Sequence, residues 1–229
     1  MNGRRPLSER RIVEAAVAVA DRGGLAAVSM RNVGAELGVE AMSLYHHVAS
    51  KEALLDALAD WIFTGIELPE EDEPWRAGMA RRAASARAVL AAHPWALGLI
   101  ESRSAPGPAL LRHHDAVLGC LRHGGLSVSL ASHAFSAIDA YVYGFVLTEQ
   151  NLPFDPATGA EDFAAGVALL LQDHPHLAEM VRELASGQGY SFAAEFGYGL
   201  ELILDQLELR FAQEAEGGPS ADRGAMGAL

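Results

Sequence analysis

The chain has 229 residues and a formal net charge of −13, and 50% of its residues are hydrophobic. This composition excludes a largely disordered protein, and the length suits one or two domains with full hydrophobic cores. The single cysteine, Cys120, excludes an internal disulfide framework and fits a reducing, cytoplasmic location. Charged residues interrupt the basic N-terminus before any apolar run begins, so we expect no secretion signal.

The charge is unevenly distributed along the chain. Residues 1–52 hold seven Lys and Arg against six Asp and Glu, whereas the remainder holds ten against twenty-four. Of the seven Lys and Arg residues in 1–52, four lie in the N-terminal arm and the first predicted helix, namely Arg4, Arg5, Arg10 and Arg11. Because an acidic body repels DNA, this distribution restricts any DNA contact to the N-terminal end.

The first predicted element is a helix. Apolar residues recur at helical spacing from Ser8 to about Arg22, and Gly23 with Gly24 is expected to end the helix. Residues 1–7 are expected to form a flexible basic arm that precedes it.

A helix-turn-helix pattern follows in residues 29–51. Ser29 is a typical N-cap for a short helix, and Gly38 can adopt the left-handed conformation that ends it. Val39 is expected to pack into the core, and residues 40–48 to form a second short helix whose polar and aromatic side chains are unsuited to burial. Such a pair is typical of a motif that places its second helix in the DNA major groove, although the isolated pattern also fits an ordinary helical hairpin.

The flanking residues favour DNA binding. The elements occur in the order found in TetR-family transcriptional repressors. They are a first helix, a Gly-rich turn, S-x-R at the start of the second helix, L-G-V at the turn and then L-Y-H-H-V-A-S-K-E-A-L-L. Residues 12–60 closely resemble the DNA-binding domain of that family. The resemblance implies a homodimer that represses transcription by binding operator DNA, with a TetR-like C-terminal domain through which a small-molecule effector releases it.

The motif also implies which residues contact DNA. The predicted DNA-binding residues are Arg31, Ala41, Met42, Ser43, Tyr45, His46, His47 and Lys51. Tyr45, His47 and Lys51 are expected to contact phosphates, and the arginine beside the second helix a base or a phosphate. Met42 and Ser43 are expected to face base edges.

Ser50 is the expected N-cap of a fourth helix that continues to about Glu67 and joins the DNA-binding domain to the body. Two prolines and a run of acids then mark a boundary. The predicted division is a helix-turn-helix domain at 1–50, a connecting helix at 51–67, a ligand-binding and dimerisation domain at 68–215 and a disordered tail at 216–229.

Only helices are predicted after this boundary. Their expected ranges are 75–92, 95–101, 109–123, 126–147, 161–171, 175–186 and 191–213. Arg76, Arg81, Arg82 and Arg87 are expected to surround the buried face of the first of them. Since no strand pattern or repeat is present, the predicted fold class is all-α.

The helix at 126–147 carries Asp139 as its only full charge. Its length suits a membrane span, but its serines and histidine are too polar for lipid. A core helix of a monomer and a helix buried partly by a second subunit both fit. Guided by the resemblance, we predict a dimer built from the helices at 126–150 and 191–213, in which Ile203→Glu gives monomers if Ile203 faces the partner.

No motif for catalysis or for a cofactor is present. The nine histidines lack the spacing of a zinc site, and no nucleophile elbow or phosphate-binding loop occurs. The sequence therefore predicts no metal, no cofactor and no enzyme activity. The alternative function is an enzyme or a protein-interaction module that retains a helix-turn-helix as a structural element.

One buried ligand site is predicted. Phe135, Asp139 and Tyr143 follow at four-residue steps on one face of the central helix, and a buried carboxylate needs a partner. Arg82 and His114 from neighbouring helices are the predicted partners. These five residues form either an effector pocket or, alternatively, a hydrogen-bonded core around a structural aspartate.

Overall fold

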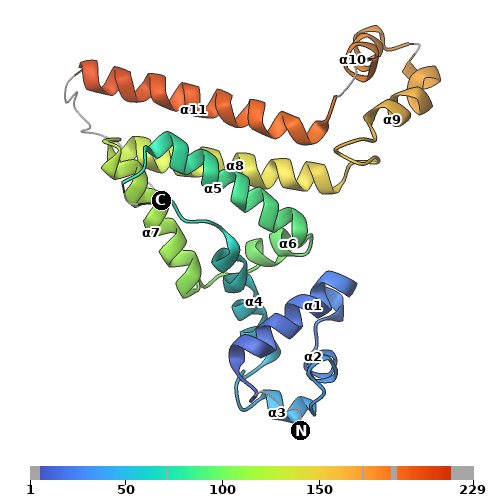
Figure 1. Cartoon of the computed structure of the whole chain (residues 1–229), viewed down its shortest axis with the longest axis vertical. Coiled ribbons are helices and arrows are strands. Elements are labelled where there is room, and N and C mark those ends of the chain that lie inside the picture. The colour runs from blue at the N-terminus through green and yellow to red at the C-terminus, as the bar shows by residue number, and fades with distance from the viewer. Residues whose placement is uncertain (1–5, 71, 172, 187–189, 218–229) are drawn as a thin grey trace, which may run out of the picture.

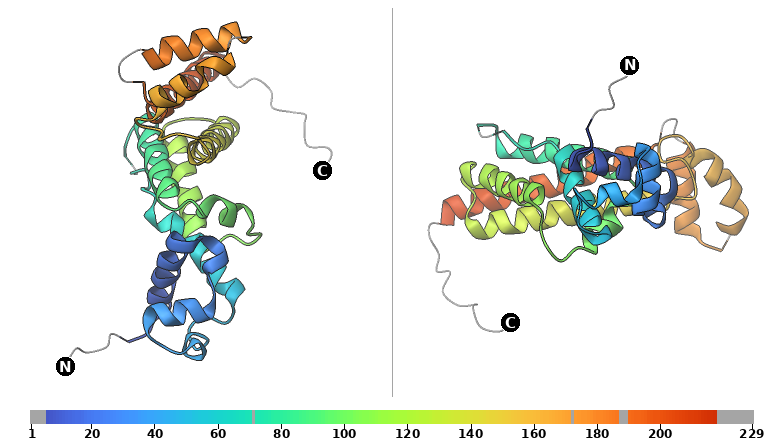
Figure 2. Two further views of the ribbon diagram at one scale, coloured as in Figure 1. Left: turned by 90° about the vertical axis from the view of Figure 1, so that its right-hand side faces the viewer. Right: turned by 90° about the horizontal axis from the view of Figure 1, so that it is seen from below.

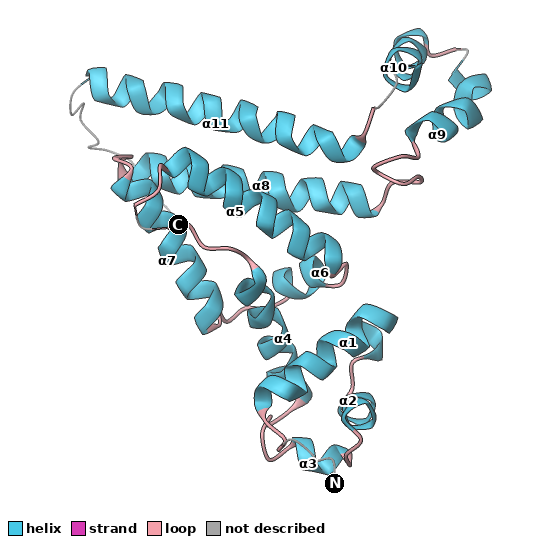
Figure 3. Ribbon diagram, in the orientation of Figure 1, coloured by secondary structure: helices cyan, strands magenta, loops and turns pink. Residues whose placement is uncertain are grey.

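The computed structural model describes residues 6–70, 72–171, 173–186 and 190–217. Within these ranges the chain forms eleven α-helices, one 3-10 helix and no strand, which confirms the all-α class (Figure 3). Helices α1 to α3 form a small head at one end of the molecule, and α5 to α11 form the body (Figure 1). Helix α4 runs from the head into the body.

The head contains three helices, α1 (Glu9–Ala27), α2 (Met30–Leu37) and α3 (Ala41–Leu44). The side chain of Ser8 caps α1 as its sequence position predicts. Gly24 interrupts α1 with a φ of 68°, so the regular helix ends where the glycines predict, and one further turn follows. The head core consists of buried residues from all three helices and α4, among them Ile12, Ala16, Val33, Leu44, Leu54 and Leu58.

The turn between α2 and α3 is tight. Ser29 accepts a hydrogen bond from the Asn32 N–H at 3.1 Å, and Gly38 has a φ of 66°, as the sequence predicts. A Cβ on Gly34 would lie 2.9 Å from the carbonyl oxygen of Val39, so glycine permits the close approach of the two helices. Helix α3 is shorter than predicted, because a turn replaces its last residues.

Helix α4 (Lys51–Gly65) begins after its N-cap Ser50 and ends slightly earlier than predicted. The body begins with α5 (Trp75–Ala92), which has the predicted bounds and buries Met79, Ala83, Ala86 and Leu90. The remaining elements are α6 (Ala96–Glu101), α7 (Pro108–His123), α8 (Val128–Gln150), α9 (Ala160–Val167), the 3-10 helix (Ala168–Leu171), α10 (Pro175–Ser186) and α11 (Phe192–Gly217).

Helix α8 is the central helix of the body. By length and composition alone it could cross a membrane. In the structure it packs against α5, α7 and α11 (Figures 1 and 2), with Ala134, Ile138 and Val146 in the core. It is therefore a helix of the body core, although only 33% of its most apolar 18-residue window is buried there.

Helix α11 lies along α8. Leu200, Leu204 and Leu207 are buried between the two helices and the body core. The helix continues to Gly217, so the prediction that the disordered tail starts at residue 216 is wrong. The rest of that predicted tail, like the first five residues of the predicted basic arm, lies outside the described residues.

A tyrosine fixes the start of α11 on α8. The Tyr141 hydroxyl donates a hydrogen bond to the carbonyl oxygen of Phe196 at 2.9 Å. A Cβ on Gly199 would clash with the same hydroxyl. Because glycine has no Cβ, it allows the Tyr141 side chain to approach the α11 backbone at this position.

Helices α9 and α10 project beyond the ends of α8 and α11 (Figures 1 and 2). They pack mainly on each other and on the short 3-10 helix. Exposed apolar side chains remain on these three elements, including Phe163, Leu170, Leu177 and Met180.

Candidate DNA-binding surface and effector pocket

Helix α3 combines one buried anchor with an exposed surface. Leu44 is buried in the head core, whereas Met42 on the same helix is 72% exposed. Tyr45 is 44% exposed, and Ala41 and Ser43 are half-buried. An apolar side chain this exposed contributes little to folding, which fits contact with another molecule.

Exposed polar residues flank α3 along the chain. They include Arg31 on α2, His46 and His47 in the turn after α3, and Lys51 at the start of α4. Backbone N–H groups and a partial positive charge favour phosphate binding at a helix N-terminus such as that of α4. The eight predicted DNA-binding residues are thus exposed or half-buried, and their contact with DNA stays a prediction.

Helix α4 attaches the head to α7. The Asp60 carboxylate accepts hydrogen bonds from the N–H groups of Ala109 at 2.8 Å and Leu110 at 3.0 Å. Asp60 therefore satisfies two of the backbone donors that the first turn of α7 leaves unpaired. A Cβ on Gly107 would clash with this carboxylate, so glycine allows the contact.

Helix α6 is attached to the head at both ends. Before α6, the Trp95 indole donates to Asp21 of α1 at 2.7 Å, and His93 Nδ1 lies 2.8 Å from the same oxygen. After α6, Arg103 forms an ion pair with Glu52 of α4 at 3.0 Å. A displacement of α6 therefore acts on both α1 and α4.

A buried polar cluster lies inside the body. Arg82 is 1% exposed and forms an ion pair with Asp139 of α8. Its Nε donates a hydrogen bond to Nε2 of His113 on α7 at 3.0 Å. The prediction that Arg82 lies outside the buried face of α5 is wrong, because a buried carboxylate pairs with it. Of the two predicted partners of Asp139, Arg82 pairs with it, whereas the His114 ring lies against Phe135.

His113 is held in its neutral form. Burial, followed by the positive charge of Arg82 and the neighbouring His114, lowers the pKa of His113 to about 3. An unfolded histidine binds a proton below about pH 6.5, so between these values the unfolded state holds more protons. As pH falls through this window, His113 should lower the free energy of unfolding by about 1.4 kcal/mol per pH unit.

Urea unfolding of the wild type and a His113→Gln variant at pH 7 and pH 5 measures this contribution. The stability advantage of the wild type should shrink at pH 5. An advantage of equal size at both pH values would contradict a neutral His113.

Aromatic rings surround the polar cluster. The ring centroids of His113 and Phe63 are 5.4 Å apart, and those of His114 and Phe135 are 4.8 Å apart. Burial lowers the pKa of His114 and raises that of Tyr143. The structure thus gathers the five predicted ligand-binding residues in one cluster, with rings from α4, α7 and α8. Their role in binding a ligand stays a prediction.

A cavity of about 240 Å³ lies between α4, α6 and α7. Its lining includes Asp60 and Phe63 of α4, Ile100 of α6, Arg103 in the following loop and Leu110 of α7. Phe63 belongs both to this wall and to the aromatic cluster. The five predicted ligand-binding residues are not among those that line the cavity.

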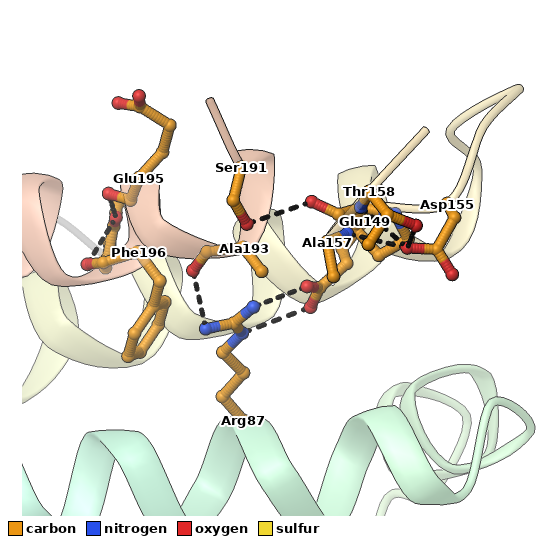
Figure 4. A network of polar contacts seen from close by, with 11 residues as sticks. Arg87, Glu149, Asp155, Ala157, Thr158, Ser191, Ala193, Glu195 and Phe196 are labelled. Carbon is orange, nitrogen blue, oxygen red and sulfur yellow. Dashed lines mark hydrogen bonds and ion pairs between the residues drawn. The ribbon is translucent and has the colours of Figure 1, made fainter. Parts of the chain in front are cut away.

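A second polar network joins three helices at the far end of α8 (Figure 4). Arg87 of α5 forms an ion pair with Glu149 of α8 and donates to the carbonyl oxygen of Ala193 at 2.9 Å. Its guanidinium also lies 4.9 Å from the ring centroids of Phe145 and Phe196. Arg87 thereby holds the start of α11 against α5 and α8.

His113 was missed as a site residue, and a spacing argument could have found it. Ala109, Val117 and Leu121 of α7 are buried, and His113 shares their face at four-residue steps. Its neighbour His114 is the predicted ligand-binding residue instead. In the part of the chain that the structure describes, no three His, Cys, Asp or Glu side chains gather to hold a metal ion.

Comparison with known families identifies the chain. Residues 12–58 match the family of bacterial regulatory proteins, tetR family, and residues 68–211 match the tetracyclin repressor-like C-terminal domain. The two matches correspond to the head and to the body. The protein belongs to the TetR family of bacterial transcriptional regulators.

Individual relatives agree with this assignment. The HTH-type transcriptional repressor DrrR1 of Streptomyces coeruleorubidus is 35% identical over 92% of this chain and 83% of its own length. The tetracycline repressor protein class C of Escherichia coli is 30% identical over 88% and 91%. The structure of ActR from Streptomyces coelicolor in complex with actinorhodin has a TM-score of 0.71 and 27% identity, covering 90% and 99%. The chain is therefore a DNA-binding transcriptional regulator.

Proposed function

We propose that the protein is a cytoplasmic homodimer that represses transcription from an inverted-repeat operator and is released by a small-molecule effector. The exposed surface around α3 is the observation that carries the proposal. In this scheme, residues 1–50 bind DNA, residues 51–67 connect, and residues 68–215 bind the effector and the second subunit. DrrR1 is named as a repressor, and ActR is described in complex with a small molecule, which supports the scheme.

The side chains around α3 divide into two groups by chemistry. Tyr45, His47 and Lys51 present hydrogen-bond donors suited to phosphates, which set position and affinity. Met42 and Ser43 lie on α3 itself, where an apolar side chain suits the methyl group of thymine. The acidic body confines this contact to the head.

Lys51 and Met42 should therefore affect DNA binding differently. Lys51→Ala should weaken binding to all DNA sequences and reduce the slope of log affinity against log salt concentration by about 1. Met42→Ala should instead alter the preference among operator variants. Fluorescence anisotropy with DNA from upstream of the protein's own gene, at several salt concentrations, measures both effects.

Arg112→Ala is the matched control, because Arg112 is an exposed cation on α7 of the body. It should leave both the affinity and the salt slope unchanged. Unchanged DNA binding in both head variants would exclude α3 and the start of α4 from the interface.

The proposed dimer face is apolar and lies on α11 and α8. Tyr198, Leu202 and Leu209 of α11 are 68%, 55% and 58% exposed, and their spacing places them on one side of the helix. Leu147 of α8 is 56% exposed. Ile203, by contrast, is half-buried against the core. Its more exposed neighbour Leu202 is therefore the better probe of the dimer than Ile203→Glu.

A Leu202→Glu/Leu209→Glu variant should be monomeric at micromolar concentration, because four carboxylates would meet in the apolar interface. Light scattering measures the mass. Met42→Glu is the control, since Met42 is also exposed but lies in the head, and this variant should stay dimeric. A monomeric wild type would contradict the proposed dimer.

The proposed switch acts through α4. The cavity of about 240 Å³ is smaller than a usual ligand pocket, so a drug-sized effector buried in it would displace walls such as Phe63 of α4. Since α4 begins at Lys51, such a displacement moves the head. A ligand that prefers the displaced state weakens DNA binding, and a typical coupling of about 1–3 kcal/mol corresponds to roughly 5–150-fold.

The alternative, an enzyme or interaction module with a structural helix-turn-helix, makes a different prediction. It requires no salt-dependent binding to upstream DNA. The exposed Met42 favours the repressor, because a purely structural α3 would gain nothing from it.

A further inference from the structure

One ring nitrogen of His113 has no partner. The His113 side chain is fully buried, and among the described residues its Nδ1 is the one buried side-chain nitrogen or oxygen without a hydrogen bond. Its other nitrogen, Nε2, accepts a hydrogen bond from Arg82 Nε. A neutral imidazole that accepts at Nε2 carries its proton at Nδ1. The unpartnered group is therefore an N–H donor.

A donor of this kind requires an acceptor. Buried polar groups in folded proteins are almost always hydrogen-bonded, and an exception marks a missing partner such as a ligand or a water. Asp139, the nearest carboxylate of the cluster, is already paired with Arg82. The acceptor must therefore come from outside the described side chains.

The surroundings define the chemistry of this acceptor. Rings of Phe63 and His114 lie 5.4 Å and 5.9 Å from the His113 ring, and Phe135 lies beyond His114. The charge of Arg82 is neutralised by its ion pair with Asp139, so the cluster offers no unpaired positive charge to an anion. Such a site favours an uncharged acceptor on an aromatic group.

The cavity gives access to this donor. Phe63 and Leu110 line the cavity, and the centroid of the Phe63 ring lies 5.4 Å from that of the His113 ring. Leu110 lies one helical turn before His113 on α7. We infer that displacement of Phe63 opens the way from the cavity to His113.

We propose that His113 is a specificity-determining residue that donates its Nδ1–H to an uncharged carbonyl group on an aromatic effector. This inference rests on the proposed function, in which an effector binds between α4, α7 and α8. It gives a role to the second nitrogen of His113, since the hydrogen bond from Arg82 uses only Nε2.

The test uses two tricyclic probes that differ only at the acceptor. 9-Fluorenone carries a carbonyl group where fluorene carries a methylene, and both are uncharged. Binding to the full-length protein is measured by quenching of its tryptophan fluorescence. The wild type should bind fluorenone about 10-fold more tightly than fluorene, the range expected for one buried hydrogen bond.

Two variants isolate the donor. His113→Gln keeps an acceptor for Arg82 but removes the donor at the Nδ1 position, so the two affinities should agree within about 2-fold. His113→Asn places an amide N–H near the Nδ1 position and should restore the preference for fluorenone. A merely structural role of His113 would change both affinities together and leave their ratio intact.

Equal affinities in the wild type, no binding of either probe at its solubility limit, or an unchanged ratio in His113→Gln would each overturn the proposal. Equal affinities are also the result expected if a water molecule partners Nδ1. Binding to upstream DNA is measured separately. A wild type that prefers fluorenone but does not bind DNA would refute the repressor and leave the assignment of His113 standing.

Discussion

Arg82→Met is expected to lower the free energy of unfolding by about 3 kcal/mol or more, the largest effect of any single substitution considered. Removal of one partner of a buried ion pair leaves the other charge without compensation, which costs about 3–5 kcal/mol. Here the side chains of Arg82 and Asp139 are only 2% and 13% exposed. The substitution also removes the donor to Nε2 of His113. Urea unfolding followed by circular dichroism measures the loss.

The double variant Arg82→Met/Asp139→Leu separates the buried charge from the lost packing. Because it removes both charges together, it should recover most of the stability that the single variant loses. A loss of less than 1 kcal/mol in Arg82→Met would show that water reaches the pair. The cluster would then be a solvated site and not a buried core.

Asp60→Ala is expected to cost about 1–2 kcal/mol, because it removes the acceptor for two N–H groups at the first turn of α7. This is the range for the loss of a helix N-cap, although here the cap comes from another helix. Since the same contact attaches α4 to the body, the head should also become less fixed, and operator affinity should fall several-fold. Thermal unfolding and anisotropy measure the two effects.

Asp60→Asn provides the control. Its amide oxygen can accept the same two hydrogen bonds, so stability and operator affinity should stay close to the wild type. If Asp60→Ala lowers stability but leaves operator affinity unchanged, this contact does not position the head.

Local signals made much of the fold predictable. Ser8, Ser29 and Ser50 act as caps where the sequence places them, because a cap depends on only a few neighbouring residues. Gly38 ends α2 for the same local reason. The DNA-binding surface could be proposed because its motif has fixed spacing in one continuous stretch of chain.

The polar interior was less predictable, because its partners are distant in sequence. Arg82 lies among four arginines on α5, and only contacts 31 and 57 positions away distinguish it as buried. His113 and His114 are adjacent, so composition does not decide which one turns inward. Asp60 gave no signal, since its role depends on where α7 begins relative to α4.

The proposed effector cavity could not be read from the sequence at all. Its walls come from α4, α6, α7 and the loop at 102–107, and its volume depends on how their side chains pack. The helices that surround the cavity were predictable, but their packing at this point was not.

Footprinting of the purified protein on DNA from upstream of its own gene tests the central claim most directly. Two heads of a two-fold dimer must bind half-sites whose centres are about one helical turn of DNA, roughly 34–36 Å, or a small multiple apart. We predict two protected half-sites arranged as an inverted repeat, with an affinity that falls steeply as salt increases. Uniform protection without a repeat, or no protection at any salt concentration, would contradict the assignment of this chain as a dimeric operator-binding repressor.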